Sequence, residues 1–171
     1  QGGELGLAVL EPSDGSLSAM IPLCLANGPA RGAGHRAREA CPVTISGGVV
    51  YCSTQYGRFF AVDPTSRKIL WHYQYPSTLV GPTSRNIYAA MQMTGSRPDV
   101  SAPFILGRHL LFQPTDSAVL FCLNRITGSL IWKRDVPTMS HLACIHDGAA
   151  LIVGDGAELI EVSSGESVAT F

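Results

Sequence analysis

One segment of this chain is present twice, and two weaker copies accompany it. Residues 49–71 read VVYCSTQYGRFFAVDPTSRKILW, and residues 109–132 read HLLFQPTDSAVLFCLNRITGSLIW. Each copy has an apolar run, a polar turn, a second apolar run that ends in Asp or Asn, a tight turn, and a third apolar run that ends in Trp. Repeats with a period of a few tens of residues are typical of propellers, solenoids and arrays. The chain is therefore expected to stack several copies of one small unit.

The third unit is the most complete and predicts the form of the others. Strands are expected over residues 102–106, 109–113, 118–123 and 129–134, because apolar runs alternate there with Gly, Pro and Asn turns. This is a four-stranded antiparallel meander, the form of a propeller blade. We expect units at approximately 1–21 (incomplete), 42–75, 101–136 and 139–171, with insertions at 22–40 and 81–100. The predicted fold is an all-β propeller with an incomplete ring of about three full blades plus part of one.

The last hairpin of every unit has three positions in common. The first opens a five-residue connection, the second lies four residues later and the third four residues beyond that. In chain order they are Glu11, Gly15 and Ala19; Asp63, Arg67 and Trp71; Asn124, Gly128 and Trp132; and Glu161, Gly165 and Ala169. Glycine suits the second position because such turns need a residue with positive φ. Arg67 therefore predicts a strained or differently shaped turn, and the two Trp rings are expected to pack between blades with a partner for each N–H.

Three stretches carry a resemblance to a known family: FAVDPTSRKILW, FCLNRITGSLIW and LIEVSSGESVATF. They resemble the PQQ-like β-propeller repeat family, which is quinoprotein-like in architecture and comparable to WD40 propellers. The resemblance covers nearly the whole chain outside the two insertions, and implies a ring of more blades than this chain offers. The missing blades are expected in further sequence or, as the alternative, in a second copy. The same repeats serve quinone-dependent dehydrogenases, outer-membrane assembly lipoproteins and extracellular bacterial proteins, so the resemblance implies an extracytoplasmic (periplasmic or secreted) location.

The chemistry of the quinone enzymes is not visible in this sequence. The resemblance implies that such enzymes hold pyrroloquinoline quinone, a Ca²⁺ on carboxylate and amide oxygens, and an Asp base, often with a disulfide between adjacent cysteines. No adjacent cysteine pair occurs here. The aspartates read as turn residues that cap nearby backbone amides: Asp63, Asp116, Asp135, Asp147 and Asp155. We predict no catalytic, cofactor-binding or metal residues, and expect quinone and Ca²⁺ only if the chain is the propeller part of a dehydrogenase.

Histidines and cysteines form one close grouping. His141, Cys144 and His146 lie within six residues, and in a strand Cys144 and His146 would share a face that His141 does not. We interpret them as ordinary strand side chains, since a zinc site needs a better ligand pattern. Cys52 and Cys122 lie in apolar runs and are predicted to be buried thiols. Cys24 and Cys41 flank one loop, and whether they pair stays open.

Bulk composition limits the partners. The net charge of −1 gives no electrostatic reason to expect nucleic acid, and no apolar run is long enough to span a bilayer. Insertions usually project from one rim of a propeller and carry contacts. The candidate partner contacts within them are Arg31, His35, Arg36, Arg38 and Arg85. Residues 85–93 also predict one or two helical turns.

The sequence therefore favours a non-catalytic propeller that acts as a protein-interaction scaffold or an assembly subunit. Its expected partners are a protein or the remaining blades. The alternative is the propeller portion of a quinone-dependent alcohol or sugar dehydrogenase whose active-site residues lie outside this chain. Adjacent cysteines and Ca²⁺ carboxylates would distinguish the enzyme, and strand edges covered by another chain would distinguish the assembly.

Overall fold

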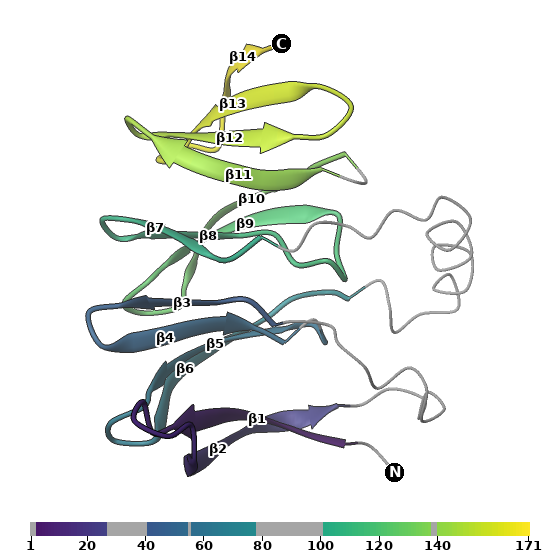
Figure 1. Ribbon diagram of the computed structural model, residues 1–171. Coiled ribbons are helices and arrows are strands. Elements are labelled where there is room, and N and C mark those ends of the chain that lie inside the picture. Colours follow the sequence, from purple (N-terminus) through teal and green to yellow (C-terminus); the bar gives the residue numbers. More distant parts are fainter. Residues whose placement is uncertain (1–2, 27–40, 55, 78–100, 138–139) are drawn as a thin grey trace.

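The chain folds into four antiparallel sheets stacked face to face (Figure 1). The computed structural model describes residues 3–26, 41–54, 56–77, 101–137 and 140–171. Blade 1 is the hairpin β1 (Gly3–Leu10) and β2 (Leu17–Ala26). Blade 2 contains β3 (Val43–Ser46), β4 (Val49–Ser53), β5 (Arg58–Asp63) and β6 (Lys68–Gln74). Blade 3 contains β7 (Phe104–Leu106), β8 (His109–Phe112), β9 (Val119–Asn124) and β10 (Leu130–Asp135). Blade 4 contains β11 (His141–His146), β12 (Ala149–Val153), β13 (Ala157–Glu161) and β14 (Ser167–Thr170).

Each complete blade is a meander in sequence order, which confirms the predicted all-β propeller-blade architecture. Short connections account for this order, because two to six residues between strands leave no room for a crossover. Blade 1 differs from the expectation in length. Its second strand was predicted to end at Ile21 but continues through Pro22 to Ala26. A register shift between Leu5 and Gly6 accommodates the proline, which pairs opposite Gly6.

Three apolar clusters fill the spaces between successive blades. The cluster between blades 2 and 3 contains Phe59, Phe112 and Phe121, all buried, with the Phe112 and Phe121 rings stacked at 5.1 Å between centroids. Alternation along the strands decides which cluster a residue joins. In β8, Leu110 and Phe112 face blade 2, whereas Leu111 faces blade 4. Every inner strand of blades 2 and 3 therefore buries both of its faces.

A tryptophan on one blade lies over the last turn of the next. The Trp71 indole N–H of blade 2 donates to the Arg125 carbonyl oxygen of blade 3 at 3.1 Å. Its ring covers Gly128, where a Cβ would come within 2.6 Å of a ring carbon. Trp132 repeats this arrangement between blades 3 and 4, with the Val162 carbonyl at 2.9 Å and Gly165 beneath the ring. Glycine is needed at these two turns for space as well as for its positive φ.

Arg67 holds the equivalent position in blade 2 with φ 57°, close to the φ of the glycine turns. The turn is therefore strained in its backbone and similar in shape to the others. The difference lies in the preceding blade, where Ala19 replaces the tryptophan. Because Ala19 supplies no ring to cover this turn, an arginine side chain fits there.

Candidate functional site

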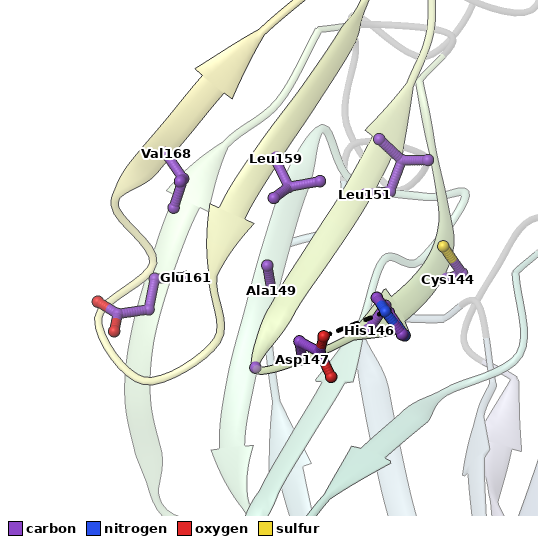
Figure 2. A pocket seen from close by; sticks show the side chains of 9 residues that line it. Cys144, His146, Asp147, Ala149, Leu151, Leu159, Glu161 and Val168 are labelled. Carbon is purple, nitrogen blue, oxygen red and sulfur yellow. Dashed lines mark ion pairs between the residues drawn. The ribbon is translucent and has the colours of Figure 1, made fainter.

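The most distinctive surface is the face of blade 4 that points away from blade 3. We call it the open face, and define it by one apolar side chain from each strand: Cys144, Leu151, Leu159 and Val168 (Figure 2). Ala149 adds to its floor, and its mouth is lined by the strand-end residues His146 and Glu161 and the turn residue Asp147. The open face is a shallow apolar depression bordered by carboxylates.

Alternation along β12 and β13 creates this face. Ala150 and Ile152 of β12 and Ile160 of β13 point toward blade 3 and are at most 3% exposed. Their neighbours Leu151 and Leu159 must then point to the opposite side. Cys144 and His146 share this side, as the sequence predicted for a strand.

The matching positions in blades 2 and 3 are buried. Tyr51 and Leu111 correspond to Leu151, and they are 3% and 0% exposed because the following blade covers them. Ala61 and Cys122 correspond to Leu159 and are also fully buried. The open face is thus an interblade surface without its neighbour among the described residues.

One small residue distinguishes the open face from its counterparts in blades 2 and 3. Ala169 pairs with Leu159 where Trp71 and Trp132 pair with Ala61 and Cys122. The face therefore has no indole that could cover a turn of the next blade. A partner that binds there must fill the depression with its own side chains.

The charged groups at the mouth are solvated and acidic. His146 Nε2 lies 3.2 Å from an Asp147 carboxylate oxygen, and both side chains are almost fully exposed. Glu161 accepts a hydrogen bond from the Ser164 hydroxyl at 2.7 Å. Among the described residues, no lysine or arginine lines the depression. This acidic mouth was not predicted, although the lack of basic residues after Arg134 is visible in the sequence.

Of the aspartates predicted to cap amides of their own turns, Asp63 has that role, whereas Asp135 lies at the end of strand β10. Asp63 accepts the amides of Thr65 and Ser66 within its own turn, and the Ser66 hydrogen bonds lower the pKa of its carboxyl. Asn124 accepts the Ile126 amide in the same way. The local role predicted for Asp116 was also wrong, because its carboxylate bonds across to another blade.

Asp116 is completely buried between blades 2 and 3. Its carboxylate accepts the Gly57 amide at 2.9 Å and the Tyr75 hydroxyl at 2.9 Å, both from blade 2. The Tyr75 hydroxyl also lies 3.1 Å from the Ser53 hydroxyl. Burial raises the pKa of Asp116, and hydrogen bonds from Ser77, Gly57 and Tyr75 oppose that rise. With no exposed surface among the described residues, this carboxyl links blades 2 and 3.

The pH dependence of stability is expected to reveal this buried carboxyl. Its native pKa lies above the unfolded value, so the part of the stability that depends on the protonated carboxyl is full below pH 3.8 and is lost as pH rises through the native pKa. Compared with Asp116→Asn, the wild type should therefore lose unfolding free energy as pH increases. Urea denaturation of both proteins from pH 4 upward measures this difference. A constant difference across that range would mean that Asp116 titrates alike in both states.

A quinone and Ca²⁺ site does not fit the described residues. Across the five described stretches, no group of three or more His, Cys, Asp or Glu side chains could hold a metal ion. Asp63, Asp116 and Asp147 lie in three different turns, each with its own local or interblade partner. These carboxylates are therefore too far dispersed to act together as Ca²⁺ ligands.

The remaining candidate residues divide into thiols and insertion residues. Cys52 and Cys122 are buried, as predicted, and burial raises the pKa of each thiol to about 12, which makes them inert. Cys24 packs against the core between blades 1 and 2, where burial raises its pKa. The predicted partner contacts and the predicted helical turn at 85–93 lie outside the described residues, and stay predictions: Arg31, His35, Arg36, Arg38 and Arg85. The described part contains no helix that could cross a membrane.

Comparison with known proteins gives one curated relative and several similar structures. No family model matches the chain. Quinoprotein alcohol dehydrogenase PedH of Pseudomonas putida is 29% identical over 134 residues, which are 77% of this chain and 20% of PedH. The crystal structure of BamB from Moraxella catarrhalis matches with a TM-score of 0.60 at 17% identity, over 96% of this chain and 42% of BamB. A europium-containing methanol dehydrogenase matches with a TM-score of 0.57 at 14% identity, over 75% of this chain and 24% of the enzyme.

These likenesses establish the fold and its extent. The chain spans about a fifth of the curated relative and less than half of the similar structures. Its blades correspond to part of a propeller in each case, in agreement with the incomplete ring that the repeats predict.

Proposed function

Because the chain carries the repeats and the fold of PQQ-type β-propellers, we propose that it acts as a non-catalytic interaction scaffold or assembly subunit. Its partner is a protein surface or the remaining blades of a propeller. The resemblance to BamB and to quinoproteins supports an extracytoplasmic compartment for this role.

The open face of blade 4 carries the proposal. Apolar side chains from all four of its strands gather there, at positions that are buried in blades 2 and 3. A sheet face of this kind is stabilised when another surface covers it, since each buried leucine contributes about 2 kcal/mol. Among the described residues, no blade covers these side chains.

A second candidate rests on the likeness to PedH. Since PedH is a quinoprotein alcohol dehydrogenase, this chain is alternatively the propeller portion of such an enzyme. The quinone and Ca²⁺ would then be held by residues outside the described stretches, because no suitable cluster lies within them.

One substitution on the open face tests the scaffold role. We expect Leu151→Glu to lower the mass of the native complex, measured by light scattering after gentle isolation, because a carboxylate cannot be buried in an apolar contact. The matched control is Ile126→Glu, which changes an exposed apolar side chain on a turn of blade 3. Dye-linked alcohol oxidation with added quinone and Ca²⁺ separates the two candidates. An unchanged mass in Leu151→Glu, together with quinone-dependent turnover, would replace the scaffold with the dehydrogenase.

A further inference from the structure

Charge is unevenly distributed along the stack of blades. Residues 137–171, which include blade 4, contain five acidic residues and no Lys or Arg: Asp147, Asp155, Glu158, Glu161 and Glu166. Residues 1–26, which include blade 1, contain three acidic residues and again no Lys or Arg: Glu4, Glu11 and Asp14. All 12 basic residues therefore lie between residues 27 and 136. Among the described residues, both ends of the stack are acidic, and the Lys and Arg side chains belong to blades 2 and 3.

Arginines of blade 3 cross both of the interfaces that this blade makes. The Arg125 guanidinium donates to the Ser46 hydroxyl of blade 2 at 3.0 Å. The Arg134 guanidinium reaches blade 4, where it donates to the Gly165 carbonyl at 3.0 Å and to the Glu158 carboxylate at 2.8 Å. The two interfaces of blade 3 thus combine an apolar centre with an arginine contact.

The open face has the acidic half of such an interface. His146 holds the position that Ser46 holds in blade 2, where Arg125 makes its contact. Asp147 lies directly beside it, and Glu161 lies two strands away, on the other side of Ala149. An arginine in the place of Arg125 on a covering blade would come next to Asp147, with Glu161 as the second carboxylate of the same mouth.

A second copy of this chain is a poor match for the same face. Its blade 1 would bring Glu11 and Asp14 in the turn that faces the mouth, with Pro12 where blade 3 has Arg125. Like charges placed together at an interface cost free energy and select against that partner.

We propose that the open face binds a basic propeller-type blade, one that supplies apolar side chains to the depression and an Arg or Lys to the acidic mouth at Asp147, and that it does not bind a second copy of this chain. The inference deepens the proposed scaffold function and rests on it. It specifies the chemistry of the partner, which the scaffold role alone leaves unspecified.

Cys144 is a reporter for occupancy of this face, because its thiol is exposed there. The test protein is the full chain extended after Phe171 by a linker copied from residues 137–140 and a copy of residues 101–136, the basic blade 3. Alkylation by iodoacetamide is followed at Cys144 alone by peptide mass spectrometry. We expect the extension to slow Cys144 alkylation by about tenfold or more, because only the undocked fraction reacts.

Two matched variants separate the charge contribution from the apolar one. Arg125→Glu in the appended copy should restore most of the Cys144 reactivity, whereas Ile126→Ser in the same turn should not. Protection should also weaken at high salt, because the Debye length falls to about 3 Å at 1 M. The unextended chain should sediment as a monomer with Cys144 fully reactive.

Three results would overturn the inference. The first is full Cys144 reactivity in an extended chain that unfolds cooperatively. The second is protection that is unaffected by Arg125→Glu and by salt. The third is a dimer of the unextended chain with Cys144 protected, which would make a second copy the occupant. The scaffold function is tested separately. If Leu151→Glu still lowers the mass of the native complex, the scaffold function stands, and a partner of different chemistry occupies the face.

Discussion

Replacing Gly128 with alanine is expected to destabilise the protein by about 3 kcal/mol, a large effect for the addition of one methyl group. The new Cβ would lie 2.6 Å from two carbons of the Trp71 ring, far inside van der Waals contact. The indole must move, which breaks its 3.1 Å hydrogen bond to the Arg125 carbonyl and its stacking on Phe59. The positive φ of 73° adds about 1 kcal/mol of backbone strain for any residue with a Cβ.

Gly15→Ala is the matched control for this prediction. Gly15 has nearly the same φ, 72°, in the equivalent turn of blade 1, but a Cβ there meets nothing within 4 Å. Only the backbone strain should remain, about 1 kcal/mol. Urea denaturation followed by tryptophan fluorescence measures both variants. Equal losses of unfolding free energy would show that ring packing contributes nothing and that φ alone selects glycine at this position.

Much of the fold is predictable from the sequence because it is local. Each hairpin joins strands that are adjacent in the chain, and Asp63 and Asn124, which open their last turns, bond to amides two and three residues later. The Trp and Gly positions repeat at a constant spacing, so packing between blades is also visible. The residue type that fits at position 67 cannot be predicted from that turn alone. It depends on the side chain that the preceding blade places over the turn.

Other features depend on contacts that a single repeat does not contain. A register shift occurs in the last hairpin of every blade, as between Ala61 and Val62 or Leu159 and Ile160, and no residue type marks it. The open face consists of ordinary strand residues that become distinctive only because no described residue covers them. Asp116 resembles any turn aspartate, but its partner Gly57 lies 59 residues away.

The Asp116 network also leads to the second large effect that we expect. Asp116→Ala should lower the unfolding free energy at pH 7 by about 3–4 kcal/mol, because it leaves the buried Gly57 amide and the Tyr75 hydroxyl without their acceptor. The Tyr75 hydroxyl retains the Ser53 oxygen at 3.1 Å as a hydrogen-bond partner. Most of the lost free energy therefore comes from the Gly57 amide, which is left without an acceptor. Asp155→Ala, in an exposed turn of blade 4, is the surface control and should change stability by less than about 0.5 kcal/mol.

A double-mutant cycle decides whether these groups act together. Tyr75→Phe removes one donor to Asp116 and should cost about 1–2 kcal/mol alone. In the Asp116→Ala background the same change should cost much less, because the hydroxyl has already lost its carboxylate. The coupling energy is then about 1 kcal/mol or more. If the two losses simply add, the hydroxyl and the carboxylate are stabilised by other partners. The buried carboxyl would then link blades 2 and 3 through the Gly57 amide and not through the Tyr75 hydroxyl.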